Sequence, residues 1–321
     1  MDGTREWLVK ALTPIWTGSV KITNCREQIG NTRLILTGLL GSIRWWFEVL
    51  VRGLGGGACD PSETQCQGRE HCVVCELFGC TGWGRKFRLQ VLARRTGESP
   101  QTEAVAESTE LRLRFRPLRP IVPEEWALLD LTLRLIAGYG AIGGKTVLKP
   151  SDEDSRAAKS HHRDYGTITI EQHPILTEVS RDRLEVHVQS SRWRQVDVDD
   201  FAWASLANFW CVNGRYLARQ NQNESTFNRV IGREEPKDLG QRIRNKQGQA
   251  NQWLAGHQGK SKKVFSFKTP PRTFGFVNPG TVEVAEIKRR LELAWQAWPE
   301  SEFLAGAAIL GRLLSNGAPG S

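Results

Sequence analysis

Five of the seven cysteines fall within one short segment of the chain, between residues 59 and 80. A structural zinc ion takes four ligands, and cysteine sulfur and histidine nitrogen are its usual protein ligands. Cys72 and Cys75 have the two-residue spacing that allows both sulfurs to reach one ion. We therefore predict a structural Zn²⁺ site, and we expect its four ligands to be Cys59, Cys66, Cys72 and Cys75.

The same segment offers more ligands than one ion needs, because it also contains His71 and Cys80. We expect the apolar run from residue 77 to 79 to pack into the core and to turn Cys80 away. A thioredoxin-like redox pair is expected at the start of a helix that follows a strand, whereas Cys72 follows a polar loop. Free reduced thiols without a metal remain the other alternative, and which four side chains bind is left open.

A glycine-rich segment at residues 138–144 resembles two nucleotide-binding motifs without matching either. A dinucleotide fingerprint must follow a strand and open a helix, whereas this segment follows a predicted helix and leads to Pro150. A Walker loop would need glycine at the position of Tyr139. Neither NAD nor ATP is supported. Together with Lys145 and Lys149, the loop can bring backbone N–H groups and charge to phosphates, or it is a plain connector.

The stretch from Leu239 to Val282 contains no aspartate or glutamate but eight basic side chains. Like charges repel one another unless a polyanion or solvent screens them. We predict contact with RNA or DNA here, with a solvated loop as the alternative. The basic residues are Arg242, Arg244, Lys246, Lys260, Lys262, Lys263, Lys268 and Arg272.

The polar stripe of the first predicted helix carries Arg44, Trp45, Glu48 and Arg52. Ion pairs at a spacing of four residues explain the arginines, whereas Trp45 either covers a neighbouring element or stacks on a base. We expect this stripe, the glycine loop and the basic stretch to line one RNA track. The predicted RNA-contacting residues are Arg44, Trp45, Arg52, Arg85, Lys86, Lys145, Lys149, Arg163, Arg242, Arg244, Lys246, Lys260, Lys262 and Lys263.

Catalysis finds little support in the residue pattern. His161 and His162 could act as acid and base in RNA cleavage, but they lie in a charged polar segment without an evident partner. The sequence shows no nucleophile elbow and no convincing carboxylate pair. We predict a protein that is not an enzyme, and we keep a metal-independent RNA-processing nuclease as the alternative.

Hydrophobic periodicity predicts the elements that must position these residues. Two segments, at 85–95 and 110–119, alternate apolar and basic side chains, which is typical of half-buried strands with a cationic outer face. The order of elements is β-α-β-β-α-β, which is the ferredoxin-like pattern. The first-half segments are strand 5–14, helix 37–57, strands 85–95 and 110–119, helix 123–138 and strand 165–172.

The second half repeats the order of elements more weakly. We predict a strand at 183–191, a helix at 199–218, a strand at 262–270 and a helix at 283–298. The predicted fold class is α+β, with two ferredoxin-like (RRM-like) domains in tandem and a cysteine-rich zinc insertion in the first. We expect the domains at 1–175, with the insertion at about 55–84, and at 176–321, with a basic insertion at about 219–263.

Composition is consistent with a polyanionic partner. The 321 residues carry a formal net charge of +9, and twelve tryptophans supply flat rings that suit bases as well as cores. No apolar run approaches the length of a membrane span, and the N-terminal residues lack a signal-peptide core. We predict a cytoplasmic protein, where cysteines are seldom joined in disulfides.

Several of these stretches together resemble the RAMP superfamily of CRISPR systems, most closely the first-numbered subunits of the type III-B Cmr complex. The stretches are LTPIWTGS, TGLLGSIRWWFEVLVRGLGG, CELFGCTGWGRKFRL, the glycine loop before RDYGTITI, and PPRTFGFV. The loop departs from the compact, arginine-containing form of the family, because a polar insertion from Ser151 to His162 splits it.

The resemblance implies a non-catalytic subunit of an RNA-guided ribonucleoprotein. Its partners would be CRISPR guide RNA, target RNA and other Cmr-complex RAMP subunits. Such a subunit lies at the end that holds the 3′ portion of the guide and helps to admit target RNA. Base pairing would then supply sequence specificity, while the protein reads the backbone. A zinc-bearing structural protein of an unrelated ribonucleoprotein is a further alternative.

Overall fold

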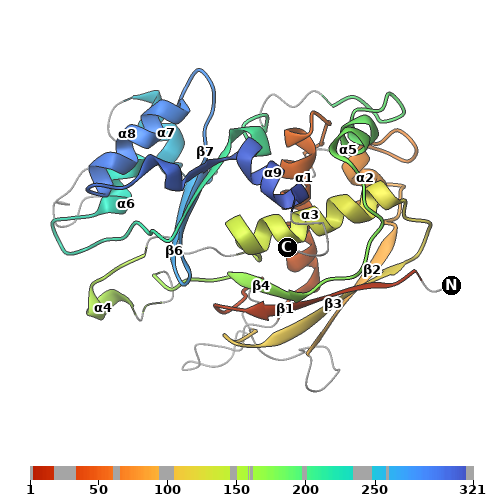
Figure 1. Cartoon of the computed structure of the whole chain (residues 1–321), viewed down its shortest axis with the longest axis horizontal. Helices are drawn as coiled ribbons and strands as arrows, with labels where there is room; N and C mark the ends of the chain where they lie inside the picture. Colours follow the sequence, from red (N-terminus) through yellow and green to blue (C-terminus); the bar gives the residue numbers. More distant parts are fainter. Residues whose placement is uncertain are drawn as a thin grey trace. The chain divides into compact units, whose positions relative to one another are not determined.

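The structure of the chain is a computed structural model (Figure 1). It describes residues 3–17, 34–60, 66–93, 105–144, 150–157, 159, 162–196, 201–233, 248–257 and 260–315.

The first sheet contains four antiparallel strands in the order β2-β3-β1-β4. This order, with a helix after β1 and another after β3, is that of a ferredoxin-like domain. The elements are β1 (Arg5–Ala11), α1 (Leu36–Gly53), β2 (Phe87–Ala93), β3 (Glu110–Pro117), α3 (Pro123–Tyr139) and β4 (Ile168–Gln172). The predicted fold of the first half is confirmed.

One face of this sheet forms the core with the two helices. Along β3 the buried side chains alternate with partly exposed arginines, as a strand with one covered face requires. Trp7 of β1 packs edge-on against Phe115 of β3, with ring centroids 5.3 Å apart. Figure 1 shows α3 lying along the same side of the sheet as α1.

The cysteine-rich insertion between α1 and β2 contains one short helix, α2 (Val73–Phe78). Leu77 of this helix is fully buried. The helix ends at Gly79, whose φ of 85° lies in the left-handed region. A side chain at this position would also meet the backbone of Trp83 and Arg85 at less than 3.0 Å, so only glycine fits the turn.

The second sheet is also antiparallel, with the order β6-β7-β5-β8. Its strands are β5 (Phe209–Asn213), β6 (Val264–Lys268), β7 (Pro271–Phe276) and β8 (Phe303–Ala305). The helices between them are α6 (Thr226–Ile231), α7 (Gln249–Ala255) and α8 (Val284–Ala294). Ile287, Leu291 and Trp298, which lie within the predicted helical segment 283–298, belong to the core cluster. The strand order confirms the second ferredoxin-like domain.

Two predicted elements of the second half are wrong. Residues 183–191 are not a strand, because Arg181–Val188 forms the helix α5. Ser180 begins this helix by accepting a hydrogen bond from the Arg183 N–H, and the buried residues Leu184, His187 and Val188 follow helical spacing. The apparent alternation included Val186, which is exposed.

The described part of the predicted helix 199–218, which is residues 201–218, does not form an α-helix. The short 3₁₀ turn η1 (Leu206–Asn208) leads directly into β5, a strand that lies between β7 and β8. Four consecutive residues of β5 are buried. A central strand with both faces covered reads as an unbroken apolar run, and periodicity cannot separate such a run from a buried helix.

Contacts divide the chain into two compact units that each draw on separated segments. Unit 1 contains residues 1–145, 165–207 and 307–321, and unit 2 contains 146–164 and 208–306. Each sheet takes its strands from one of the two ranges predicted from the sequence, while the boundary near residue 175 stays a prediction. The remaining elements are α4 (Asp154–Ala157), η2 (Glu300–Glu302) and α9 (Gly306–Ser315).

Candidate metal centre and nucleic-acid interface

Four cysteine sulfurs come together in the insertion of unit 1. The sulfurs of Cys59, Cys66, Cys72 and Cys75 all lie within 4.8 Å of one another, and all four side chains are buried. The Sγ atoms of Cys59 and Cys75 are 3.3 Å apart. Four thiolates on a zinc ion, each at about 2.3 Å, would be separated by about 3.8 Å, so this group could hold a metal ion.

The short helix α2 sets the spacing of Cys72 and Cys75. Cys72 is the residue that precedes the helix, and Cys75 lies in its first turn. The backbone N–H of Cys72 donates to the Cys66 sulfur at 3.4 Å. An N–H group directed at a cysteine sulfur stabilises the thiolate form that a metal requires.

Two arginines also direct N–H groups at the cluster. Arg44 of α1 donates to the Cys75 and Cys59 sulfurs at 3.3 and 3.6 Å, and Arg194 donates to the Cys66 sulfur at 3.6 Å. A divalent ion with four thiolates has a net charge of about two negative units. The two guanidinium groups therefore balance the charge of an occupied site.

Without a metal, the four thiols cannot all ionise together. A hydrogen bond from Cys66 to Cys72, followed by burial, raises the pKa of Cys66 to about 12. A hydrogen bond with Cys59 raises the pKa of Cys72, but hydrogen bonds from Cys66 and Cys75 outweigh it and bring this pKa to about 7. Metal binding must therefore release several protons, which makes the affinity of the site depend on pH.

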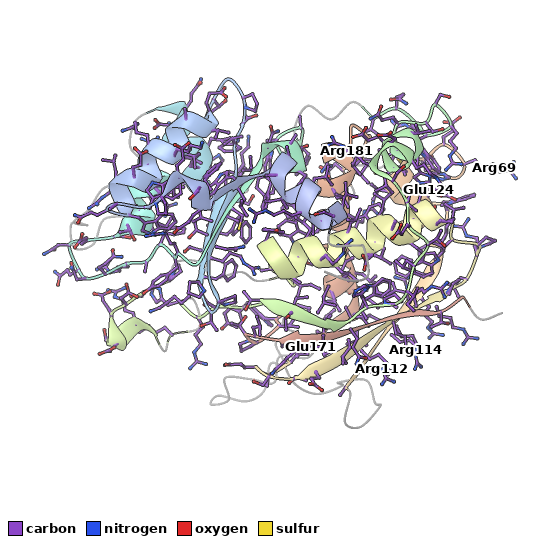
Figure 2. All side chains as sticks on the ribbon, in the orientation of Figure 1. Arg69, Arg112, Arg114, Glu124, Glu171 and Arg181 are labelled. Carbon is purple, nitrogen blue, oxygen red and sulfur yellow. The ribbon has the colours of Figure 1, made fainter. Side chains whose placement is uncertain are left out.

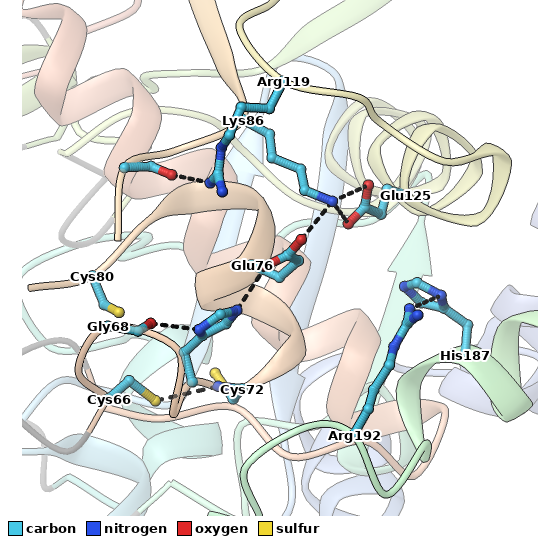
Figure 3. A network of polar contacts seen from close by, with 12 residues as sticks. Cys66, Gly68, Cys72, Glu76, Cys80, Lys86, Arg119, Glu125, His187 and Arg192 are labelled. Carbon is cyan, nitrogen blue, oxygen red and sulfur yellow. Dashed lines mark hydrogen bonds and ion pairs between the residues drawn. The ribbon is translucent and has the colours of Figure 1, made fainter. Parts of the chain in front are cut away.

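The two spare ligands have other neighbours (Figure 3). His71 places Nδ1 2.7 Å from the carbonyl oxygen of Gly68 and Nε2 2.7 Å from a carboxylate oxygen of Glu76. Both ring nitrogens are thus used within the protein. The Cys80 sulfur lies outside the four-cysteine group and is partly exposed.

Lys86, which we predicted to contact RNA, is buried in the same network. Its Nζ lies 2.6 Å from Glu76 and 2.8 Å from Glu125 of α3. Burial raises the pKa of the Glu125 carboxyl, although Lys86 acts in the opposite direction. Figure 3 shows the lysine connecting the insertion to α3. This placement speaks against an RNA contact, because the ammonium group does not reach the surface.

The arginines on the polar stripe of α1 likewise have their partners inside unit 1. Arg44 also donates to Glu48 at 2.9 Å and to the carbonyl oxygen of Gly79 at 3.0 Å. Arg52 is only 5% exposed and donates to the carbonyl oxygens of Ala58 and Ala204. Both arginines thus have internal partners, and their RNA contacts stay a prediction.

Trp45 is half-buried and packs edge-on against Trp46, with ring centroids 4.9 Å apart. This contact favours the alternative in which Trp45 covers its neighbours over the one in which it stacks on a base.

The glycine loop uses its backbone N–H groups internally. Gly143 donates to the Ser42 hydroxyl, Gly144 to the Trp16 carbonyl and Ile142 to the Gly166 carbonyl. A side chain at Gly140 would overlap the ring of Trp46. Among residues 138–144, these contacts favour the connector alternative. Lys145 and Lys149 lie outside the described residues.

The basic stretch divides between described and undescribed parts. Arg242, Arg244 and Lys246 lie outside the described residues. Lys260 is exposed, whereas Lys263 is buried and donates to the Ser261 carbonyl. Lys262 lies over the rings of Phe227 and Phe265, and burial lowers its pKa to about 7.

Of the other predicted RNA contacts, Arg85 and Arg163 are exposed in the structure. They are available to a partner, as is Lys260.

Sequence reasoning found the four cysteines but missed the arginines that support them. Arg194 reaches Cys66 across 128 positions of the chain. No local pattern marks such a pair. Arg44 was singled out, but for its spacing from Glu48 and not for its position beside the cysteines.

Comparison with known proteins supports the family expectation for the first part of the chain. The family model described as the RAMP superfamily matches residues 8–148. This range contains the four-cysteine group, and the predicted resemblance to the RAMP superfamily is confirmed by the match. No curated protein matches the sequence.

Among solved structures, the apo form of Cmr1 from Pyrococcus furiosus is similar to this chain. The match covers 98% of this chain and 97% of Cmr1, with 10% sequence identity and a TM-score of 0.41. With a TM-score and a sequence identity this low, the similarity supports no conclusion about function. In the described part of the chain, no helix is long and apolar enough to span a membrane.

Proposed function

We propose that the chain is a non-catalytic RNA-binding subunit of a type III-B CRISPR effector complex. It would lie at the end that holds the 3′ portion of the guide RNA, help to admit target RNA, and contact other RAMP subunits of the Cmr complex. The cytoplasm is its proposed location. The match of residues 8–148 to the RAMP superfamily is the observation that carries this proposal.

Charge and fold support an RNA-binding role. The chain has an excess of nine basic residues over acidic ones. Both sheets have the ferredoxin-like strand order, which RNA-binding domains also use. The proposed contacts on the described surface are Arg85, Arg163 and Lys260. Outside the described residues they are Lys145, Lys149, Arg242, Arg244 and Lys246.

We also propose that the metal of the four-cysteine group is zinc and that its role is structural. Four thiolates fill the tetrahedral shell of zinc and leave no open position for a water or a substrate. Metal analysis of protein purified without chelators should find about one zinc ion per chain. An intact fold with four freely titratable thiols and no metal would contradict this assignment.

RNA binding by the full chain tests the proposed function. Affinity for labelled RNA of mixed sequence should fall steeply with salt, because lysine and arginine contacts release the counterions of the phosphates. Neutralising Arg242, Arg244 and Lys246 together to glutamine should reduce the salt slope by about one unit for each contact that is lost.

A matched control removes three positive charges that are already paired with glutamates in unit 2. These charges belong to Arg229, Lys288 and Arg289. The control variant should bind RNA as the unaltered chain does. If both triple variants weaken binding equally, the basic stretch holds no site and net charge alone attracts RNA.

Two results would overturn the proposal outright. One is failure of the unaltered chain to bind RNA even at low salt. The other is RNA cleavage that is lost after His161→Ala and His162→Ala, which would establish the nuclease alternative.

A further inference from the structure

The first sheet has a second face, and that face is cationic. Because β3 places Leu111, Leu113 and Phe115 in the core, its intervening arginines point to the opposite side. Figure 2 shows two of them, Arg112 and Arg114, on the side of the sheet away from α3. The basic residues of this face are Lys10, Arg88, Arg112, Arg114 and Arg116.

Only some of these charges are neutralised. Arg112 and Arg114 both form ion pairs with Glu6 of β1, the former at 3.4 Å. Arg88 and Arg116 are both exposed, and within the described residues neither forms an ion pair. Glu6 offsets only one of the two arginines that it pairs with, whereas Lys10 lies opposite Glu110 in the register of β1 and β3. The uncompensated charge of the face therefore lies along β2 and β3.

Arg88 and Arg116 are also direct cross-strand partners in the register of β2 and β3. Their side chains consequently project from the same face at neighbouring positions. Like charges placed directly opposite each other destabilise a sheet. The pair is unfavourable for the protein alone, and an anion lying between or across the two guanidinium groups would reverse the sign of that interaction.

Two more arginines extend the cationic region at this end of the strands. Arg85 precedes β2 and is exposed, and Arg119 follows β3 and lies over the ring of Trp83 at 4.3 Å. The N–H groups of Leu118 and Arg119 both donate to the Lys86 carbonyl, so these flanking segments are held side by side. We call Arg85, Arg88, Arg116 and Arg119 the β2–β3 arginine patch.

The composition of the face indicates what kind of anion fits it. Alternation along the four strands assigns no phenylalanine, tyrosine or tryptophan to the outer side. The face therefore lacks the aromatic platform on which unpaired bases stack. Arginine forks bind phosphate oxygens in pairs, so the face suits a phosphate backbone whose bases point away from it.

We propose that the β2–β3 arginine patch binds the phosphate backbone of RNA, without reading its bases. This inference rests on the proposed RNA-binding function and adds a surface on unit 1 to it. Since only phosphates are contacted, RNA of any sequence should bind equally well here.

The first test neutralises the pair in the full chain. Arg88→Gln with Arg116→Gln should weaken binding of labelled mixed-sequence RNA about tenfold at low salt and reduce the salt slope by about two units. The control, Arg181→Gln with Arg183→Gln, removes the same charge from α5 in the same unit. Each of these arginines is paired with a glutamate, and RNA affinity should not change.

A charge reversal separates ligand binding from folding. Arg88→Glu places a carboxylate opposite Arg116, which replaces a repulsive cross-strand pair with an attractive one. The midpoint of thermal unfolding should stay equal or rise, while RNA affinity falls. A change in fold would instead lower both.

The outcomes distinguish failure of the patch inference from failure of the proposed RNA-binding function. If the unaltered chain binds RNA and all three variants bind equally well, the patch inference is overturned while the proposed function stands. If the pair variants keep RNA affinity but no longer co-purify with other complex subunits, the patch is a protein-docking surface and the inference is likewise overturned. If the unaltered chain binds no RNA, the proposed function fails, and the inference falls with it.

Discussion

The two sheets share one strand order, yet their faces are used differently. In the first sheet, buried and partly exposed side chains alternate along β3, and the outer face carries arginines. In the second sheet, consecutive residues of β5 and β7 are buried, so both faces are covered. Topology alone therefore does not decide whether a ferredoxin-like sheet offers a surface to a ligand.

Aromatic rings pack in the cores of both units, but unit 1 also contains the four-cysteine group. Unit 1 relies on a four-cysteine group, with arginines and buried ion pairs around it. Within the described residues, unit 2 has no group of this kind, and rings pack along its sheet. Phe274 lies 5.6 Å from Phe209, 5.1 Å from Phe265 and 5.7 Å from Phe267, measured between ring centroids. Polar and aromatic stabilisation respond to different perturbations, which makes the comparison testable.

The largest expected effect is the loss of the metal. Cys75→Ser removes one of the four sulfurs of the proposed zinc site. Because structural zinc contributes directly to folding, unit 1 should lose much of its protection from amide hydrogen exchange. Peptides from the second sheet should exchange as before. Cys80→Ser is the matched control, since this sulfur lies outside the group. Unchanged metal content in Cys75→Ser would show that another residue is the ligand.

The counterpart in unit 2 is Phe274→Ala. Removing this ring leaves a cavity among three other phenylalanines and should cost about 3–5 kcal/mol of unfolding free energy, with metal content unaltered. Denaturant unfolding measures the cost. Leu293→Ala, at an exposed position of α8, should change stability by no more than about 0.5 kcal/mol. A similar loss of unfolding free energy in both variants would show that packing around Phe274 does not stabilise unit 2 specifically.

A smaller effect is expected for Arg44→Met. The variant keeps the length of the side chain but removes the N–H groups that are directed at Cys59 and Cys75. Metal affinity should fall about 10- to 100-fold, as is usual when a group that supports metal ligands is lost. Competition with a metallochromic chelator measures this change. RNA affinity should not change, and a loss of RNA affinity with intact metal binding would restore the direct RNA contact predicted from the sequence.

The smallest effect concerns pH, and its sign should differ between the units. Burial, with help from Arg192, lowers the pKa of His187 in unit 1 to about 4. The folded state binds this proton less well than the unfolded state does. The contribution of His187 to the free energy of unfolding is therefore complete above pH 6.5 and is lost as the pH falls toward 4. Burial raises the pKa of Asp164 in unit 2 to about 6. The contribution of Asp164 to the free energy of unfolding is complete below pH 3.8 and is lost as the pH rises through 6.

Acidification from pH 6.5 to 4 should therefore weaken unit 1 through His187 and strengthen unit 2 through Asp164, by about 1–2 kcal/mol each after allowance for solvent screening. Loss of a bound metal as the thiolates are protonated would weaken unit 1 further, so the His187 contribution is the difference between the unaltered chain and His187→Gln. Hydrogen exchange, corrected for the pH dependence of intrinsic exchange rates, can follow both units in one chain. His187→Gln and Asp164→Asn should each flatten the response of its own unit. A response of the same sign in both units would disprove the assignment.

Local sequence patterns determined the four-cysteine group and most of the elements. Cys72 and Cys75 are two residues apart, and one turn of α2 suffices to bring their sulfurs together. The helices α1 and α3 carry long apolar stripes, and β2 and β3 alternate clearly, so each could be recognised from its own residues. Element order then specified the ferredoxin-like fold of unit 1.

The tertiary structure decided what local patterns left ambiguous. Residues 209–212 form a strand only because β7 and β8 pair with them on both sides, and an apolar run has no period that reveals this. Arg44 and Lys86 looked like surface cations, yet long-range contacts with sulfurs and carboxylates hold them inside. A charged side chain is inward or outward according to partners that are distant in sequence, and those partners meet only in the folded chain.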